Sequence, residues 1–366
     1  MHFGAARFSI VRMPAKPTPV RESADARVTR YALGFITYAL IVWTLWIAAH
    51  AYGVAHTLHG HLLSPFIAVA LMLGVVWAFG WGAGEPLAHW MSATSPVALA
   101  RNSRRPLTAL SLARILVPGV FAAGIYLLIA VPLGELSSLW LLIFFAFPAV
   151  LAALLEYLPP GEKLGWQDVA VLAALGCAVE YGWLQRSVPE PGLGNFSKFL
   201  LTDVALYLYL VLRRLPGMGF DLGLRPRDLA IGLREWAFFA PVGIGGGLAL
   251  GFLGFHARLP AAGTFAGTVL VTFIFVAIPE ELFFRALLQN LLETRLSRRQ
   301  ALAVAAVIFG LSHYMHGAVF NWRYVILATI AGVFYGRAWR SERRLAASAV
   351  SHTLVDSVWV TWFLAS

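Results

Sequence analysis

Eleven apolar stretches follow one another along this chain, and most are close to the twenty residues that an α-helix needs to cross a bilayer. They cover residues 31–53, 64–84, 110–132, 138–156, 168–185, 199–212, 236–255, 264–287, 301–316, 323–339 and 346–364. Hydrophobic residues make up 59% of the sequence and charged residues 13%, which is about half the charged share of a soluble domain. The sequence therefore predicts an all-α, polytopic membrane helix bundle with about eleven transmembrane helices.

The net charge of +10 could indicate nucleic-acid binding, but the positions of the basic residues favour another explanation. If the N-terminus is cytoplasmic and the helices alternate in direction, most of the 28 lysines and arginines fall in cytoplasmic segments. This distribution follows the positive-inside rule, so it supports both the helix count and a cytoplasmic N-terminus. We expect anionic lipid headgroups to bind these charges, and we expect no nucleic-acid partner.

The order of polar and apolar segments divides the chain into four parts. We expect a flexible basic cytoplasmic tail at 1–30, transmembrane helices of unassigned role at 31–212, an amphipathic cytoplasmic linker at 213–235 and a motif-bearing transmembrane core at 236–366. The linker is expected to form an ordered turn and then a helix on the inner leaflet. No internal repeat typical of transporters is apparent.

Three short polar motifs lie in the apolar stretches of the last quarter of the chain. They are Glu280-Glu281-Leu-Phe-Phe-Arg285, Phe309-Gly-Leu-Ser-His313 and His352-Thr-Leu-Val-Asp356. An ionisable side chain within a membrane helix costs about 2.5–3.5 kcal/mol on insertion, so such residues usually have a function. Their concentration in one region predicts an active site within the bilayer.

Helical spacing decides which of these side chains can meet. Glu281 and Arg285 are four residues apart, so they lie on one helix face and are expected to form an ion pair. Glu280 points about 100° away from Glu281, which leaves its carboxylate available to water. His352 and Asp356 are also four residues apart, so Asp356 is expected to accept a hydrogen bond from His352 or to line the site beside it.

The basic turn at Leu296 gives a depth for the motifs. Glu280 precedes it and His313 follows it by nearly equal numbers of residues, so an antiparallel hairpin brings both to about 24 Å from the turn. His352 is expected somewhat closer to the cytoplasmic side unless its helix tilts. Together the motifs are consistent with one polar cavity, where a buried carboxylate could activate water and histidines could orient it, donate to an oxyanion or bind a metal.

In this order on apolar helices, Glu-Glu-x-x-x-Arg, Phe-x-x-x-His and His-x-x-x-Asp/Asn resemble the motifs of the CPBP family of intramembrane proteases. That family includes the CAAX prenyl endopeptidases and bacterial relatives, some of them linked to bacteriocin immunity. The resemblance covers roughly residues 236–366, while the first five or six helices show no family signal. The third motif ends in Asp356, where the prenyl-protease branch typically has Asn.

The resemblance implies a role for each motif residue. Glu280 would be the general base that activates water, and His313 would assist it. Glu281 and Arg285 would hold the geometry of the site. His352 and Asp356 would stabilise the tetrahedral intermediate.

Other intramembrane protease chemistries need motifs that this chain lacks. The His-Glu-x-x-His of a zinc protease is absent, the serine turn of a rhomboid-type protease is missing at Ser312, and no paired aspartates of the aspartyl type occur. The single cysteine, Cys177, excludes a disulfide framework and a cysteine-based metal site. We expect no cofactor.

A divalent metal such as zinc is an alternative to the metal-free mechanism. Its oxygen and nitrogen ligands would come from Glu280, Glu281, His313 and His352. We favour the metal-free mechanism, because Arg285 beside the carboxylates would oppose cation binding.

We therefore expect a glutamic-type intramembrane endopeptidase of the bacterial cytoplasmic (inner) membrane, which hydrolyses a peptide bond of a membrane-associated protein or peptide. One alternative is a non-enzymatic scaffold or immunity factor that binds a partner through the same cavity. A transporter that uses the buried charges as an ion relay is a third possibility, which the absence of repeat symmetry disfavours. The sequence does not identify the substrate.

Overall fold

The computed structural model describes residues 24–51, 60–84, 86–87, 109–188, 196–257, 259–314 and 320–365. Its α-helices are α1 (Ala24–Ala51), α3 (Leu63–Gly80), α5 (Ala109–Leu133), α6 (Ser138–Tyr157), α7 (Trp166–Glu180), α8 (Phe196–Leu206), α9 (Pro226–Ala249), α10 (Ala262–Val271), α11 (Ile278–Glu281), α12 (Asn290–Leu292), α13 (Arg298–Leu311), α14 (Trp322–Glu342) and α15 (Leu345–Trp362). The 3₁₀ turn η1 (Leu184–Ser187) follows α7, and π-helical segments form η3 (Tyr207–Leu212), η4 (Thr272–Ala277) and η5 (Leu282–Gln289). Most of the expected tail at 1–30 lies outside the described residues.

Each predicted apolar stretch contains helix, so the all-α fold class is confirmed. The short stretch at 199–212 corresponds to α8 and η3, and the stretch at 264–287 is part of one continuous helix from α10 through η4, α11 and η5 to α12. By length and hydropathy, five of the described helices could cross a membrane: 25–50, 63–80, 109–133, 138–157 and 262–292. This supports an integral membrane protein.

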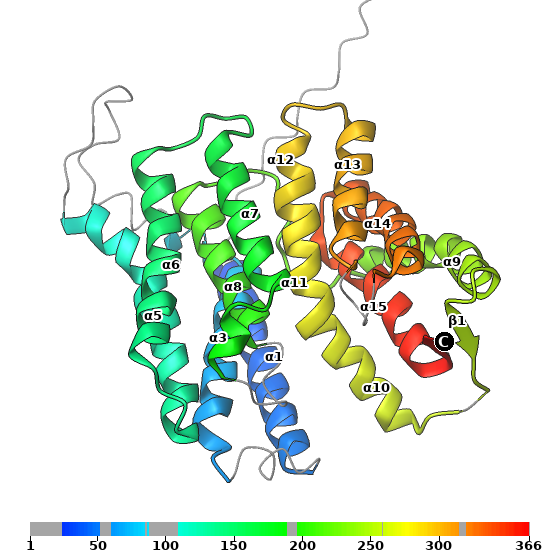
Figure 1. The fold of residues 1–366 in the computed structure, drawn as a ribbon, viewed down its shortest axis with the longest axis horizontal. Coiled ribbons are helices and arrows are strands. Elements are labelled where there is room, and N and C mark those ends of the chain that lie inside the picture. Colours follow the sequence, from blue (N-terminus) through cyan, green and yellow to red (C-terminus); the bar gives the residue numbers. More distant parts are fainter. Residues whose placement is uncertain are drawn as a thin grey trace, which may run out of the picture.

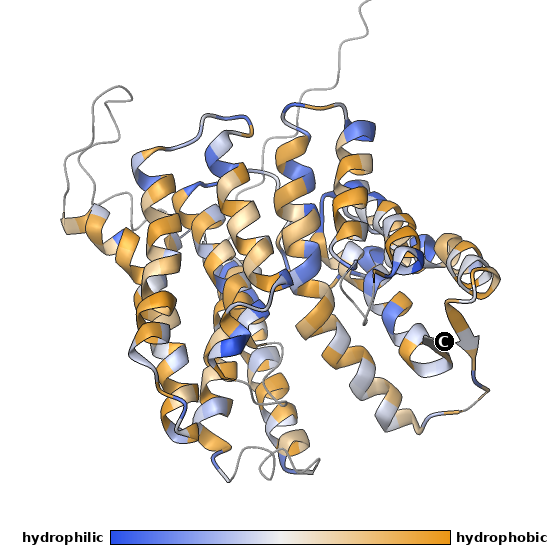
Figure 2. Ribbon diagram, viewed as in Figure 1, coloured by the Kyte–Doolittle hydropathy of each residue, from blue (hydrophilic) through white to orange (hydrophobic). Residues whose placement is uncertain are grey.

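The helices form two groups on either side of the continuous helix α10–α12 (Figure 1). Helices α1, α3 and α5–α8 lie on one side, and α9 and α13–α15 lie on the other. A shared apolar core includes Leu200 of α8, Ile278 of α11 and Leu345 of α15, so the continuous helix is packed from both sides. Hydrophobic residues dominate the helices, while hydrophilic ones gather at the helix ends and around α11 (Figure 2).

Helix α9 differs from the prediction for the linker. It begins at Pro226 and continues to Ala249, so the amphipathic helix expected at the end of the linker and the apolar helix after it are one helix. Proline suits the first turn of a helix, and Asp228 accepts a hydrogen bond from the backbone N–H of Arg225 at 3.0 Å, which fixes this start. The apolar helix also ends earlier than expected, before Gly251 with φ of +61°.

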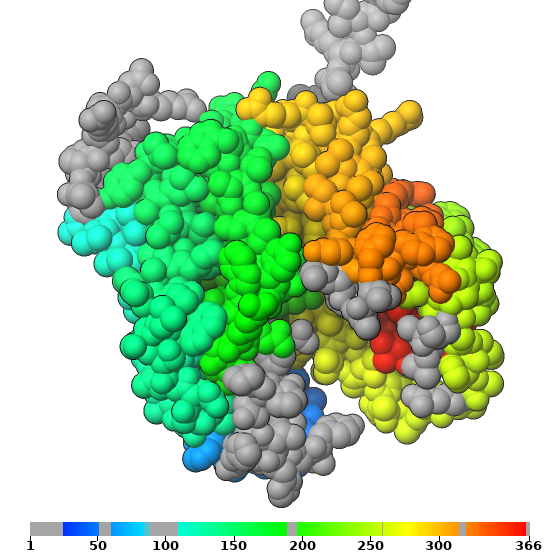
Figure 3. Space-filling view, in the orientation of Figure 1, coloured from blue at the N-terminus to red at the C-terminus, as the bar shows by residue number. Residues whose placement is uncertain are grey.

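The chain after α9 forms a short strand instead of more helix. Strand β1 (Leu253–Phe255) pairs antiparallel with β2 (Phe363–Ala365), which follows α15. Helix α15 also packs against α9, α14 and η4. In the space-filling view only a small part of α15, drawn in red, is visible between α14 and α9 (Figure 3). The helix that carries the third motif therefore packs against several other helical segments.

The linker after η3 packs closely against the turn between α14 and α15. A Cβ atom on Gly219 would lie 1.9 Å from the carbonyl oxygen of Arg343, so only glycine fits there. The Gly219 carbonyl accepts a hydrogen bond from Leu345 N at 2.9 Å, and Arg344 donates to Asp228 at 2.8 Å. These contacts fix the start of α15, and with it the depth of the third motif.

Candidate active site

A fully buried carboxylate, Glu281, is the centre of the polar cluster. Its Oε2 lies 3.1 Å from Arg285 Nε and accepts a hydrogen bond from the hydroxyl of Ser348 on α15. Its Oε1 lies 2.9 Å from His352 Nδ1. The expected Glu281–Arg285 ion pair is therefore present, and it is joined by two side chains from α15.

Aromatic rings enclose the guanidinium of Arg285. Its Cζ lies 4.7 Å from the ring centroid of Phe309, 5.6 Å from Tyr335 and 5.8 Å from Phe284. Such cation–π contacts stabilise a desolvated cation beyond its ion pair with Glu281. Phe309 of the second motif thus contributes to the packing around Arg285.

Glu280 faces a different direction from Glu281, as helical geometry predicts. Its Oε1 accepts a hydrogen bond from the ammonium of Lys198 at the start of α8. Its Oε2 is buried, has no hydrogen-bond partner among the described residues and lies 3.7 Å from His352 Nε2. One oxygen of this carboxylate is held by a lysine, and the other lacks a partner within the described part of the chain.

A cavity of about 260 Å³ lies beside Glu280, and it is built by both groups of helices. Leu175, Gly176, Val179, Glu180, Gln185, Ser197, Lys198, Leu201, Thr202 and Ala205 line it from α7, η1 and α8, while Pro279, Glu280, Leu282, Phe283, Phe284, Ser312 and His313 line it from α11, η5 and the end of α13. Glu280 and His313 were predicted at equal depth, and both line this cavity.

The ring of His313 is oriented by its own helix. Its Nδ1 lies 2.8 Å from the carbonyl oxygen of Phe309, which can only accept, so Nδ1 carries the proton in that hydrogen bond. Its ring also packs edge-on against Phe309 and Tyr324. With Nδ1 protonated, Nε2 is the ring nitrogen that carries the lone pair.

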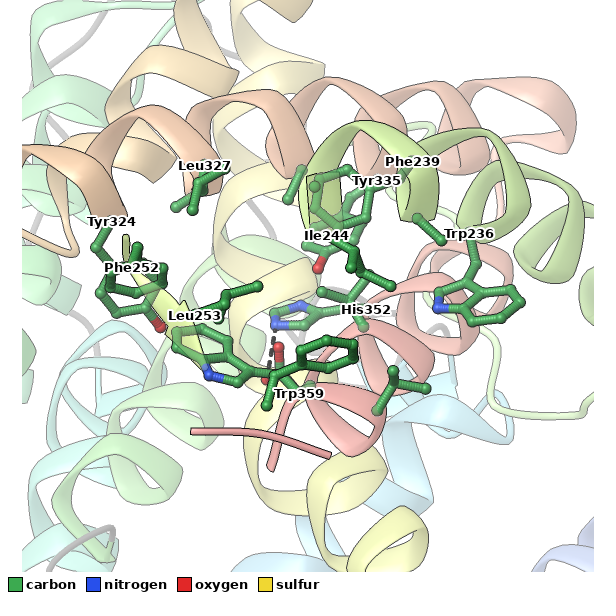
Figure 4. A pocket seen from close by; sticks show the side chains of 18 of the residues that line it. Trp236, Phe239, Ile244, Phe252, Leu253, Tyr324, Leu327, Tyr335, His352 and Trp359 are labelled. Atoms are coloured by element: carbon green, nitrogen blue, oxygen red, sulfur yellow. Dashed lines mark ion pairs between the residues drawn. The ribbon is translucent and has the colours of Figure 1, made fainter. Parts of the chain in front are cut away.

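His352 and Asp356 lie at a second, smaller pocket of about 70 Å³. His352 Nε2 is 3.4 Å from Asp356 Oδ2, as the four-residue spacing predicts, and the imidazole stacks on Tyr335 with centroids 4.5 Å apart. Figure 4 shows His352 among aromatic side chains of this pocket, including Phe252 and Trp359. His313 lines both pockets, so it lies between the Glu280 cavity and the Asp356 pocket.

The backbone around the first motif departs from a regular α-helix. Two π-helical segments, η4 and η5, flank the four residues of α11, and Pro279 in α11 has no N–H to donate. Insertions of this kind widen a helix locally and are frequent at functional sites. Here they lie directly before and after the segment that carries the two adjacent glutamates.

Two residues of the cluster were not predicted from the sequence. Ser348 lies four residues before His352, so its position on the same helix face was a usable signal. Lys198 lies in none of the three motifs, and only the packing of α8 against α11 brings it to Glu280.

The predicted zinc alternative finds no support in this arrangement. Within the described ranges, no group of three or more His, Cys, Asp or Glu side chains converges as a metal site. Lys198 and Arg285 each lie against one of the two glutamates, where their charges oppose a cation. The residues present do not fit a bound divalent metal.

One comparison with known proteins finds a relationship. Residues 262–358 match the family model described as type II CAAX prenyl endopeptidase Rce1-like. This segment contains all six predicted site residues, whereas Lys198 lies outside it. Neither the comparison with curated proteins nor that with solved structures finds a match.

Proposed function

Residues 262–358 belong to the Rce1-like family of type II CAAX prenyl endopeptidases, and from this we propose that the protein is an intramembrane endopeptidase of the glutamic type. Its substrate is a membrane-associated protein or peptide. The chain crosses the bacterial inner membrane about eleven times with its N-terminus in the cytoplasm. The positive-inside distribution of lysine and arginine supports this orientation.

In the proposed reaction Glu280 is the general base. A water molecule beside Oε2 attacks the carbonyl carbon of the scissile peptide bond while its proton passes to Oε2. Burial of Oε2 without a hydrogen-bond partner among the described residues supports this assignment, because a free acceptor is what the step needs. His313, which lines the same cavity, helps to orient the water.

Attack on the carbonyl creates a negative charge on its oxygen. His352 stabilises this oxyanion through Nε2 when that nitrogen carries a proton, and Asp356, 3.4 Å away, orients the ring. When the carbon–nitrogen bond breaks, the proton held by Glu280 passes to the leaving amine. Water is thereby divided between the new carboxyl and amino termini, and Glu280 returns to its charged form.

Glu281 and Arg285 act as a fixed support in this proposal. Both are fully buried, and Glu281 contacts His352 Nδ1 directly. A rigid support matters because small displacements of catalytic groups strongly reduce rates.

One observation carries the proposal above the others: Glu280 Oε2 and His352 Nε2 face each other at 3.7 Å with neither bonded directly to the other. A hydrogen-bonded pair would be closer, so this spacing suits two groups that act on a common molecule. A purely structural pair would be expected to close the gap.

The test compares protein N-termini, measured by mass spectrometry, in membranes of cells that express wild type or Glu280→Gln at matched levels. Glutamine keeps the shape of the side chain but cannot accept the proton. We expect N-termini that occur only with the wild type, and these would identify the substrate. Identical profiles, with both proteins folded, would contradict the proposal and favour the non-enzymatic binding function.

A further inference from the structure

Lys198 is a charged residue outside residues 262–358, the segment that the family match covers. It is the third residue of α8, and its side chain is 21% exposed. Its ammonium donates to Oε1 of Glu280, whose side chain is 16% exposed. The lysine is therefore half-buried, and its contact with Glu280 gives the charge a partner where water is restricted.

The short length of α8 explains how a residue near its start reaches the site. From Lys198 to the end of η3 at Leu212 the helix rises by about 21 Å. From Glu280 to the end of α12 at Leu292 the rise is about 18 Å. The first turn of α8 therefore lies at nearly the same depth as Glu280, and the positive end of its helix dipole adds to the charge of Lys198.

The charges around Glu280 show what the lysine does there. Glu180 of α7, the adjacent Glu281 and Asp356 of α15 are acidic, while His313 and His352 are the neighbouring histidines. Arg285 is already engaged with Glu281. Lys198 is therefore the cation that directly balances Glu280, and without it a carboxylate would be left buried among other acids.

We propose that Lys198 is a positioning residue of the active site, whose ammonium holds Glu280 through Oε1 so that Oε2 is directed at the attacking water. This inference rests on the proposed role of Glu280 as general base. It assigns to the N-terminal helices a part in catalysis, because α8 supplies the group that orients the base. Lys198 itself does not touch the reacting atoms.

The experiment replaces and then restores the ammonium. The sequence contains one cysteine, Cys177, so Cys177→Ala gives a cysteine-free parent and Lys198→Cys adds a unique thiol. Treatment with 2-bromoethylamine converts that thiol into a lysine analogue of equal length. The matched control is treatment with 2-bromoethanol, which gives a neutral side chain of the same size. Both reagents are also applied to the cysteine-free parent.

Each form is purified, reconstituted in liposomes and assayed on the substrate found by the comparison of N-termini. For Lys198→Cys we expect kcat to fall about a hundredfold, the size of effect that misplacing a catalytic group causes, while KM changes little. The aminoethylated protein should recover most of this loss, and the hydroxyethylated protein should not. Lys198→Met, which has no thiol, should resemble the hydroxyethylated form.

Equal activity of Lys198→Cys and its parent, or equal recovery with both reagents, would overturn the inference. Glu280→Gln in the same assay separates this failure from that of the proposed function. If Glu280→Gln is inactive while Lys198→Cys is fully active, only the role of Lys198 is wrong. If Glu280→Gln is as active as wild type, the proposed glutamic mechanism fails and the role of Lys198 fails with it.

Discussion

His352 Nδ1 lies 2.9 Å from Oε1 of Glu281, although the two residues are 71 positions apart in the chain. A carboxylate can only accept a hydrogen bond, so Nδ1 carries the proton in this contact. The other ring nitrogen is then directed at Glu280 and Asp356. The buried Glu281–Arg285 pair thus determines which nitrogen of His352 is presented to the site.

The hydroxyl of Ser348 is expected to contribute to this support. It donates to Oε2 of Glu281, so Ser348→Ala should lower the free energy of unfolding by about 1–3 kcal/mol, the cost of leaving a buried charged acceptor unsatisfied. Ser351 is the matched control on the same helix, because its buried hydroxyl has no hydrogen-bond partner among the described residues. Thermal unfolding in detergent should therefore show a lower midpoint for Ser348→Ala only, and equal midpoints would contradict this role.

Arg285→Met should be far more damaging. It leaves Glu281 fully buried without its cation, and loss of one partner of a buried pair costs about 3–5 kcal/mol. Arg285→Lys should restore only part of this stability, since an ammonium cannot reproduce the contact of the flat guanidinium with the Phe309 ring. The same unfolding assay tests both variants, and a methionine variant as stable as wild type would show that the pair is not a support.

Asp356 offers a test of how the oxyanion is stabilised. Asp356→Asn should keep cleavage within about tenfold of wild type, because the amide can still accept from His352 and can itself donate to an oxyanion. Asp356→Ala removes both possibilities, and kcat should fall about a hundredfold or more. The Asp356 side chain is 27% exposed, so neither change should unfold the protein. Comparable losses in the two variants would mean that Asp356 is needed as a charge.

Asp203 is a buried carboxylate outside the polar cluster of the site. It is 2% exposed in α8, and neither of its oxygens has a hydrogen-bond partner among the described residues. Burying an uncompensated carboxylate is costly, so Asp203→Asn should leave the unfolding midpoint unchanged or raise it. Asp168 is the control, since it is equally buried but pairs with Arg213 at 3.1 Å and caps α7. Asp168→Asn should lower the midpoint, and a similar drop for Asp203→Asn would show that Asp203 has a partner.

Local spacing was sufficient to predict much of the site. The Glu281–Arg285 and His352–Asp356 contacts follow from helical periodicity alone, and the shared cavity of Glu280 and His313 follows from their equal distance to one turn. His352 was expected at a shallower depth unless α15 tilts. In the structure its ring reaches Glu281 directly, which the packing of α15 inside its group of helices determines.

The sequence alone could not predict contacts between helices that are far apart along the chain. Lys198 meets Glu280 across 82 residues, and the contact depends on α8 beginning at the depth of the site. The joining of the linker helix to the apolar helix in α9 was missed for a local reason. The apolar pattern predicts a transmembrane helix that starts at residue 236, although Pro226 and the Asp228 cap mark the true start of α9. The number of membrane crossings, the four-part division of the chain and the site roles stay predictions.

The central claim is that Glu280 removes the proton from the attacking water. The most direct measurement is the rate at which purified protein in liposomes cleaves the substrate identified from its new N-terminus, for wild type and for Glu280→Gln with equal unfolding midpoints. Loss of a general base typically costs about 10²–10⁴ in rate, so the variant should fall to that level or to background. A Glu280→Gln variant that is folded and cleaves within about tenfold of wild type would contradict the account.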